Sequence, residues 1–390
     1  MCIHEHPMFA FSEFRHPDRQ TDNAALTPSR LTTPDMAAAC RVSSRRDREM
    51  KTTYRAVQAT SPGKLELVEL PLIEPPPGHV RIRVEACGVC HSDSWTVEGN
   101  YLPGIAYPRV PGHEVVGTID AIGEQAEPWV PGQRVGVGFL GGHCGICQHC
   151  RRGDTISCET RNITGISVDG GYAEMMIAKA NALVSIPDEL SSADAAPLLC
   201  AGLTTFNALR NAKARAGELV AIEGVGGLGH LAVQYAAHMG FRVAVVSRGI
   251  DKRDIAIKLG AHHYIDSTSE DVAAALQDLG GAMGILATAV DNRAMSALIN
   301  GLAPRGEMII AGLGGSAPIE VHALPLVRGS RAITGSLTGD PIDSEDTLGF
   351  SALQGVQAMS EIFPLERASE AYQRMMRNEA RFRIVLVTGR

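Results

Sequence analysis

The residues best suited to chemistry are cysteines gathered in one short segment. Residues 143–158 read HCGICQHCRRGDTISC, with cysteines at Cys-x2-Cys-x2-Cys-x7-Cys spacing: Cys144, Cys147, Cys150 and Cys158. Four thiolates saturate a tetrahedral zinc ion and leave no open position for a substrate. The spacing therefore predicts a structural zinc lobe at residues 141–160, and any catalytic chemistry must lie elsewhere.

Two disulfides are the alternative for these four cysteines. Disulfides belong to oxidising compartments, and the sequence shows no secretory signal with a continuous apolar core. We therefore favour zinc over disulfides.

A glycine-rich segment predicts a dinucleotide site. The run Gly224-Val225-Gly226-Gly227-Leu228-Gly229 fits G-x-G-x-x-G between a strand expected at 218–223 and a helix expected at 227–239. In this motif Gly224 makes the tight turn, Gly226 lets a pyrophosphate approach, and Gly229 allows close packing of helix and strand. The helix N-terminus supplies a dipole for the phosphates.

The end of the next expected strand, 242–247, indicates the coenzyme. An NAD site usually places Asp or Glu there, whereas this chain has Ser247 followed by Arg248. Ser247 can hydrogen-bond a 2′-phosphate, and Arg248 with Lys252 or Arg253 can neutralise it. Solvated surface cations are the alternative, and we favour NADP(H).

Three further potential metal ligands are scattered along the chain. Cys90 lies in GVCHSD, His113 in GHE and Cys200 in CAGLT, and spacing alone does not unite them. Together with the four-cysteine segment and GVGGLG, these motifs occur in an order that closely resembles the zinc-dependent medium-chain alcohol dehydrogenases. The resemblance extends from about residue 52 to residue 390.

The resemblance implies a second zinc ion in each subunit, this one catalytic. Cys90, His113 and Cys200 would hold it, with water or substrate as the fourth ligand, and Glu114 could coordinate transiently. Asp93 would hold the His113 ring in one tautomer. Two thiolates and an imidazole leave such a site neutral, so it keeps the Lewis acidity that four thiolates remove. Taken singly, each ligand could equally be a core thiol or a core histidine.

Other roles follow from the same resemblance. Ser92 would bond the substrate oxygen and pass on its proton, and His91 would contact the pyrophosphate. Thr204 and Leu228 would lie near the nicotinamide, although both residues could equally be core positions. Arg383 would lie near the phosphates. Many relatives have a histidine three residues after this serine, where this chain has Trp95. We expect Trp95 to line the substrate pocket instead and to favour a flat or apolar substrate.

The implied function is transfer of a hydride between NADP(H) and a small alcohol or aldehyde bound at zinc. A polyol dehydrogenase and a non-catalytic NAD(P)-binding sensor are the alternatives. A zinc-free quinone or enoyl reductase would have no use for the three scattered ligands.

The elements that must position these residues form an α/β protein. Alternating runs separated by Pro and Gly predict a β-rich domain, in which Val80, Ile82 and Val84 face a core and the charged residues between them face solvent. After Cys200, strands alternate with helices, as in a doubly wound parallel sheet. With the resemblance, this gives a GroES-like catalytic domain of residues 52–200 and 337–390 and a Rossmann domain of residues 201–336.

Composition narrows the class of partner. The 390 residues are 45% hydrophobic and 20% charged, with a net charge of −7 and no basic block, which argues against nucleic-acid and membrane partners. Residues 1–51 are expected to be disordered, or the true start is Met50. Free thiolate ligands without a targeting signal favour the cytoplasm, and the family implies a homodimer or homotetramer.

Overall fold

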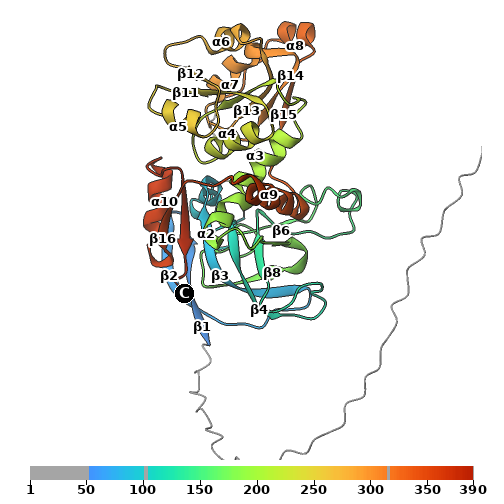
Figure 1. Cartoon of the computed structure of the whole chain (residues 1–390). Coiled ribbons are helices and arrows are strands. Elements are labelled where there is room, and N and C mark those ends of the chain that lie inside the picture. The colour runs from blue at the N-terminus through green and yellow to red at the C-terminus, as the bar shows by residue number, and fades with distance from the viewer. Residues whose placement is uncertain (1–51, 101–103, 314–316, 390) are drawn as a thin grey trace, which may run out of the picture. The chain divides into compact units, whose positions relative to one another are not determined.

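The computed structural model describes residues 52–100, 104–313 and 317–389. The expectations for residues 1–51 lie outside this range. Two large sheets dominate Figure 1, one for each predicted domain type, which confirms the α/β fold class. In the described ranges, no helix has both the length and the apolar character needed to cross a bilayer.

The first sheet is seven-stranded and built around β3. Its order is β16-β17-β3-β4-β5-β9, with β8 also paired to β3. The strands are β3 (His79–Val89), β4 (Val115–Ile122), β5 (Arg134–Val137), β8 (Met175–Lys179), β9 (Leu183–Ser185), β16 (Ser360–Pro364) and β17 (Arg383–Val387). Because β17 pairs antiparallel with β3, the C-terminal segment joins the N-terminal half of the chain. Two further sheets have two strands each. One pairs β1 (Thr53–Ser61) with β2 (Lys64–Pro71), and the other pairs β6 (Leu140–Gly142) with β7 (Asn162–Ile163).

Strand β3 departs in part from its predicted pattern. Val80, Ile82 and Val84 are buried as expected, but Arg81 on the opposite face is also only 8% exposed. Its guanidinium bonds Asp120 at 2.6 Å and the carbonyl of Ile73 at 2.9 Å. The segment after β2 therefore covers this face, and the charged Arg81, which was expected in solvent, is buried and forms an ion pair with the more exposed Asp120.

The second sheet is six-stranded and wholly parallel, in the order β12-β11-β10-β13-β14-β15. Its strands are β10 (Leu219–Glu223), β11 (Arg242–Ser247), β12 (His263–Asp266), β13 (Ala282–Ala287), β14 (Leu302–Ile310) and β15 (Ala332–Gly335). Strand order reverses between β10 and β13, and the carboxyl ends at such a reversal are where sheets of this kind bind their ligands. The glycine motif follows β10 directly.

Helices connect the strands of the second sheet. They are α4 (Gly229–His238), α5 (Arg253–Lys258), α6 (Val272–Asp278), α7 (Asn292–Leu298) and α8 (Ala323–Gly329). The rest of the described chain adds the short α1 (Ser94–Val97) and α2 (Ser192–Ala195), with α9 (Pro341–Gln354) and α10 (Ala368–Met376) near the C-terminus.

Helix α3 (Ala201–Arg210) links the two sheets. It is buried along most of its length and packs against α4 and α9. One hydrophobic core contains Val116 and Leu199 from the first half of the chain together with Val220 and Ile222 of β10. Cys200 lies at the start of α3, so this packing fixes its position relative to both sheets.

Candidate metal centres and coenzyme site

The structure brings four of the predicted metal-site residues into one buried group. Cys90 follows β3, His113 and Glu114 precede β4, and Cys200 precedes α3. One potential ligand atom from each lies within 4.8 Å of all the others. The two sulfurs are 3.9 Å apart although 110 positions separate them in sequence. We call these four residues the buried ligand group.

The His113 ring is held by a carboxylate behind it. His113 Nδ1 lies 3.0 Å from Asp93 Oδ1, and both side chains are almost fully buried. The other Asp93 oxygen accepts bonds from the Cys90 N–H at 2.9 Å and the Tyr172 hydroxyl at 2.8 Å. Asp93 thus holds the proton on Nδ1, so the lone pair of Nε2 faces the group. Tyr172 was not anticipated, because no sequence pattern links it to Asp93.

Among the described residues, His113 Nε2 has no hydrogen-bond partner. Burial alone would lower the pKa of His113, but the charges of Asp93 and Cys90 raise it well above its usual value, so the surroundings favour a positive charge beside Nε2, which a bound cation could supply in place of a second ring proton. A buried nitrogen without a partner costs about 1–3 kcal/mol. Such an atom, aimed at two thiols, is what a bound cation would satisfy.

Glu114 is backed by an arginine from the far end of the chain. It is fully buried, and its Oε1 forms an ion pair with the Arg383 guanidinium, while its Oε2 has no partner among the described residues. Burial raises the pKa of Glu114 to about 7, although the Arg383 charge opposes the rise. A Cβ at position 88 would lie 1.8 Å from this Oε2, so only glycine fits there.

The donor types of the buried ligand group suit zinc. Two thiols, an imidazole nitrogen and a carboxylate oxygen are all established zinc ligands. A tetrahedron with zinc–sulfur bonds of about 2.3 Å places its sulfurs about 3.8 Å apart. The observed separation of Cys90 and Cys200 sulfurs, 3.9 Å, matches that geometry.

The four-cysteine lobe, residues 141–160, also has sulfur separations close to those of a tetrahedral zinc site. The sulfur of Cys150 lies 3.9 Å from that of Cys144 and 3.5 Å from that of Cys147, and Cys158 lies 3.6 Å from Cys144. A disulfide requires about 2.05 Å. All four cysteines are free thiols, so the structure does not support the alternative of two disulfides.

Backbone groups support the sulfurs of the lobe. The Cys147 N–H donates to Cys144 Sγ at 3.3 Å, and the Cys144 N–H donates to Cys158 Sγ at 3.4 Å. Backbone N–H bonds from Ile146 and Cys147 lower the pKa of Cys144 to about 6. Burial and bonds with neighbouring sulfurs, Cys147 first, instead raise the pKa of Cys150 to about 12. The backbone of the lobe therefore supports a thiolate at Cys144 without any side chain from a distant element.

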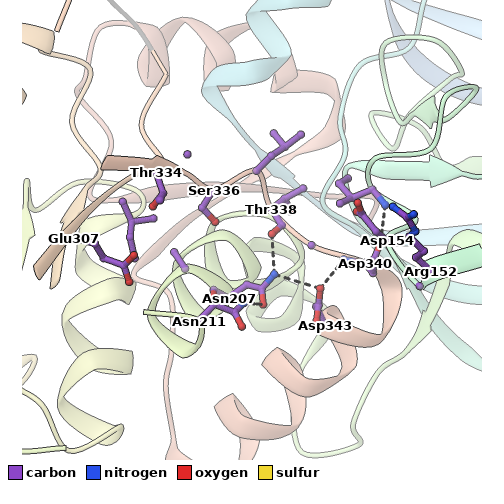
Figure 2. A pocket seen from close by; sticks show the side chains of 17 residues that line it. Arg152, Asp154, Asn207, Asn211, Glu307, Thr334, Ser336, Thr338, Asp340 and Asp343 are labelled. Carbon is purple, nitrogen blue, oxygen red and sulfur yellow. Dashed lines mark hydrogen bonds between the residues drawn. The ribbon is translucent and has the colours of Figure 1, made fainter. Parts of the chain in front are cut away.

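Asp340, at the N-cap of α9, fastens the lobe to the rest of the protein. Its Oδ1 accepts the Ile156 N–H at 2.6 Å and a bond from the Thr155 hydroxyl. A polar cavity of about 520 Å³ lies beside this contact, with Asn207 and Asp343 in its wall (Figure 2). None of the buried ligand group lines it, so this cavity is separate from the candidate metal centre.

The glycine-rich turn has the geometry that its motif requires. Gly224 has a φ of 88°, and a Cβ on Gly229 would lie 1.9 Å from the Gly224 carbonyl oxygen. A Cβ on Gly226 would meet nothing within 4 Å, so this side of the turn is open to a ligand. A Cβ on Gly227 would lie 3.1 Å from Arg383 Nη1. Arg383 thus lies between the turn and the buried ligand group.

Cations gather beyond the end of β11. Ser247 is half-buried and Arg248 exposed. Burial lowers the pKa of Lys252, and the charges of Arg381 and Arg248 lower it further. No ion pair involves these three cations within the described ranges of the chain. Arg381 was missed, because its sequence neighbourhood gives no sign that it approaches β11.

The remaining predicted residues surround these sites. His91 is exposed and Ser92 half-buried, both in the turn that follows Cys90, and neither side chain has a hydrogen bond to another described residue. Thr204 is buried in the first turn of α3, and Leu228 precedes α4 half-buried. Cys87 is a buried thiol outside the ligand group.

Aromatic rings connect Trp95 to the buried ligand group. Trp95 meets Phe139 edge-on at 6.2 Å between centroids, and Phe139 meets the His113 ring at 5.5 Å in the same manner. The indole is therefore one ring away from a predicted metal ligand. Phe139 was not anticipated from the sequence.

Comparison with known proteins identifies the family. Residues 76–188 match the alcohol dehydrogenase GroES-like domain, and residues 227–352 match the zinc-binding dehydrogenase domain. The alcohol dehydrogenase patD of Penicillium expansum is 44% identical over 86% of this chain and 98% of its own length.

Solved structures agree with this match. A cinnamyl alcohol dehydrogenase of Sorghum bicolor has a TM-score of 0.77 and 30% identity over 86% of this chain and 97% of its own. The Helicobacter pylori CAD complexed with NADP(H) has a TM-score of 0.77 and 25% identity over 87% of this chain and 99% of its own. The chain is thus an oxidoreductase of small-molecule alcohols or aldehydes and belongs to the zinc-dependent medium-chain alcohol dehydrogenase family.

Proposed function

We propose that this protein is an NADP(H)-dependent zinc alcohol dehydrogenase that also works in reverse as an aldehyde reductase. The observation that carries the proposal is the buried ligand group, in which the unpartnered Nε2 of His113 faces the thiols of Cys90 and Cys200.

Cys90, His113 and Cys200 are the proposed ligands of the catalytic zinc, and Glu114 a transient fourth. The zinc would serve as a Lewis acid that polarises the oxygen of an alcohol or carbonyl substrate. The four cysteines of the lobe would hold a second, structural zinc ion. Asp93 keeps the His113 proton on Nδ1 and so keeps Nε2 available as a ligand.

Ser92 is the proposed proton carrier for the substrate oxygen. It lies two residues after Cys90, in the same turn, and its half-buried position allows it to exchange a proton with water or with the exposed His91. Trp95 occupies the place of the usual relay histidine and cannot accept a proton there. We assign it instead to an apolar wall with Phe139, which favours flat or apolar substrates.

The coenzyme would bind along the glycine-rich turn, from Gly224 to Gly229, with Thr204, Leu228 and Arg383 nearby. The nicotinamide coenzyme supplies or accepts the hydride. Ser247 offers a hydroxyl without negative charge, and the cations Arg248, Lys252 and Arg381 would together neutralise a 2′-phosphate. This unpaired positive cluster is the support for NADP(H) over NAD(H).

The domain limits are proposals as well. We assign residues 52–200 and 337–390 to the catalytic domain and residues 201–336 to the coenzyme domain. We further propose a cytoplasmic homodimer or homotetramer, because free thiolate ligands require a reducing compartment.

Metal analysis and turnover test the proposal together. Purified protein should contain two zinc ions per chain and should oxidise NADPH with a panel of apolar aldehydes, with a higher kcat/KM than for NADH. A protein that holds zinc but turns over neither coenzyme, in either direction, would refute it. A preference for NADH would refute only the coenzyme assignment.

The cation cluster can be tested separately. Arg248→Ala and Arg381→Ala should each raise the KM for NADPH by about 10-fold, the value of one charge-assisted hydrogen bond, and leave that for NADH within about 2-fold. Equal losses for both coenzymes would show that the cluster does not contact a 2′-phosphate.

A further inference from the structure

His230, the second residue of α4, is buried and bonded at both ring nitrogens. It is 0% exposed, its Nδ1 lies 2.8 Å from the carbonyl oxygen of Gly226, and its Nε2 lies 3.1 Å from the backbone nitrogen of Met359. A backbone N–H can only donate, so Nε2 accepts and Nδ1 carries the proton that is donated to Gly226. The ring therefore works as a neutral clamp between two backbone segments.

One of these segments is the glycine-rich turn. The peptide between Gly226 and Gly227 is planar and trans, so its C=O and its N–H point in opposite directions. Because His230 holds the Gly226 carbonyl on one side, it also fixes the direction of the Gly227 N–H on the other. Backbone N–H groups at this position are the ones that bind a pyrophosphate.

The other segment leads to the buried ligand group. The Met359 carbonyl accepts the N–H groups of Phe382 at 2.8 Å and Arg383 at 2.9 Å. The Phe382 ring stacks on the His230 imidazole at 5.1 Å between centroids. Arg383 then extends its guanidinium to Glu114. A continuous set of contacts thus runs from the glycine-rich turn through His230 to the candidate metal centre.

We propose that His230 is a positioning residue for the coenzyme, which sets the glycine-rich turn in register with the Met359 and Arg383 segments. The inference rests on the proposed dehydrogenase function and adds a residue to it. Its ring nitrogens bond no member of the buried ligand group, and it acts through the Gly226 carbonyl.

Gln234 offers a matched control one turn further along α4. Its side chain bonds both the carbonyl and the N–H of Gln357, at 3.0 and 3.2 Å, so it holds the chain two residues before Met359. Within the described part of the chain, the Gln234 side chain makes no hydrogen bond to the glycine-rich turn, and its remaining bond goes to the His230 carbonyl at 3.0 Å. Loss of the Gln234 side chain should therefore weaken the attachment of α4 to the Gln357 segment without reorienting the Gly226 peptide.

Direct coenzyme binding provides the test, measured by NADPH fluorescence titration on the intact zinc-loaded protein, alongside steady-state kinetics. His230→Leu should raise the Kd and KM for NADPH by about 10-fold and leave the KM for the aldehyde within about 2-fold. His230→Asn can place its amide N–H where Nδ1 lies and should keep the Kd within about 3-fold. His230→Gln reaches Met359 but not Gly226 and should resemble His230→Leu.

Several results would overturn the proposal. One is a Kd for His230→Leu within 2-fold of the wild type, and another is a Gln234→Met variant as impaired in NADPH binding as His230→Leu. Equal Kd values for His230→Asn and His230→Gln would do the same, and this comparison decides the matter if His230→Leu does not fold. If the wild type itself neither binds nor turns over a nicotinamide coenzyme, the proposed function fails instead.

Discussion

The four-cysteine lobe and the buried ligand group use the same kind of donor atom in opposite ways. The lobe takes all its sulfurs from 15 consecutive positions, Cys144 to Cys158, and supports them with its own backbone N–H groups. The buried ligand group draws on segments as far apart as Cys90 and Cys200, and side chains from elsewhere in the fold support it.

This difference separates a self-contained site from one made by the whole fold. The lobe is held by its local turns, by the anchor at Asp340 and by the bonds that Lys179 and Asn181 donate to the His143 carbonyl. The buried ligand group needs Asp93 behind His113, Tyr172 behind Asp93, and Arg383 behind Glu114. Damage to the lobe should therefore appear as lost stability, and damage to the buried ligand group as lost activity.

The largest expected effect is on turnover. Cys90→Ser should lower kcat/KM by at least about 1,000-fold, because loss of a Lewis acid costs several kcal/mol in the transition state. Zinc content should fall from two to one per chain while circular dichroism stays native. Cys87→Ala, which removes a buried thiol outside the ligand group, should keep both ions. Full activity in Cys90→Ser would abolish the distinction between the two sites.

The matching change in the lobe should act on stability. Cys147→Ser should lower the free energy of unfolding by at least about 3 kcal/mol, since metal binding at a structural site contributes directly to folding. Thermal unfolding with zinc analysis measures this loss, again of one ion per chain. The folded fraction at low temperature should retain most of its turnover. An inactive but thermally unchanged variant would reverse the roles of the two sites.

The support that Asp93 gives to the His113 ring can be tested by substitution. Asp93→Asn should lower zinc affinity at the buried ligand group, or kcat/KM, by about 10- to 100-fold, because the amide no longer holds the His113 proton as an anion does. Tyr172→Phe removes only one of the bonds to Asp93 and should cost less. Chelator competition compares the variants. An Asp93→Asn protein with wild-type affinity and kinetics would mean that the His113 ring needs no support.

The smallest expected effect concerns the anchor of the lobe. Asp340→Ala removes a helix cap and the bonds to Ile156 and Thr155, and should cost about 1–2 kcal/mol of stability with little change in kcat. Asp346→Ala is the control, because Asp346 lies in the helix that Asp340 caps. It breaks an exposed ion pair with Arg210 of α3 and should cost less stability. A loss of turnover in Asp340→Ala would show that the lobe also shapes the active site.

Sequence predicted the features that arise from local pattern. Strand Arg242–Ser247 was predicted with the bounds that the structure has, because alternating strand and helix segments have distinct periods. The lobe was found from spacing, whereas Cys90, His113 and Cys200 were united only by the family resemblance.

Contacts between distant residues left no local sign. Glu114 and Arg383 are separated by 269 positions, and nothing near Arg383 shows that its charge is needed beside a carboxylate. The burial of Arg81 was missed for the same reason, since the covering segment after β2 has no regular pattern. Tertiary packing, rather than propensity, determined each of these.

Because strand β17 lies near the C-terminus, it is synthesised after the other parts of both candidate metal sites. It pairs between β16 and β3, and its first residue, Arg383, is the partner of Glu114. A metal ion in the cysteine lobe would need no ligand beyond Cys158. The buried ligand group, in contrast, lacks the Arg383 partner of Glu114 until synthesis has passed residue 383, so the growing chain could hold a metal at the lobe long before the support of the second site is complete.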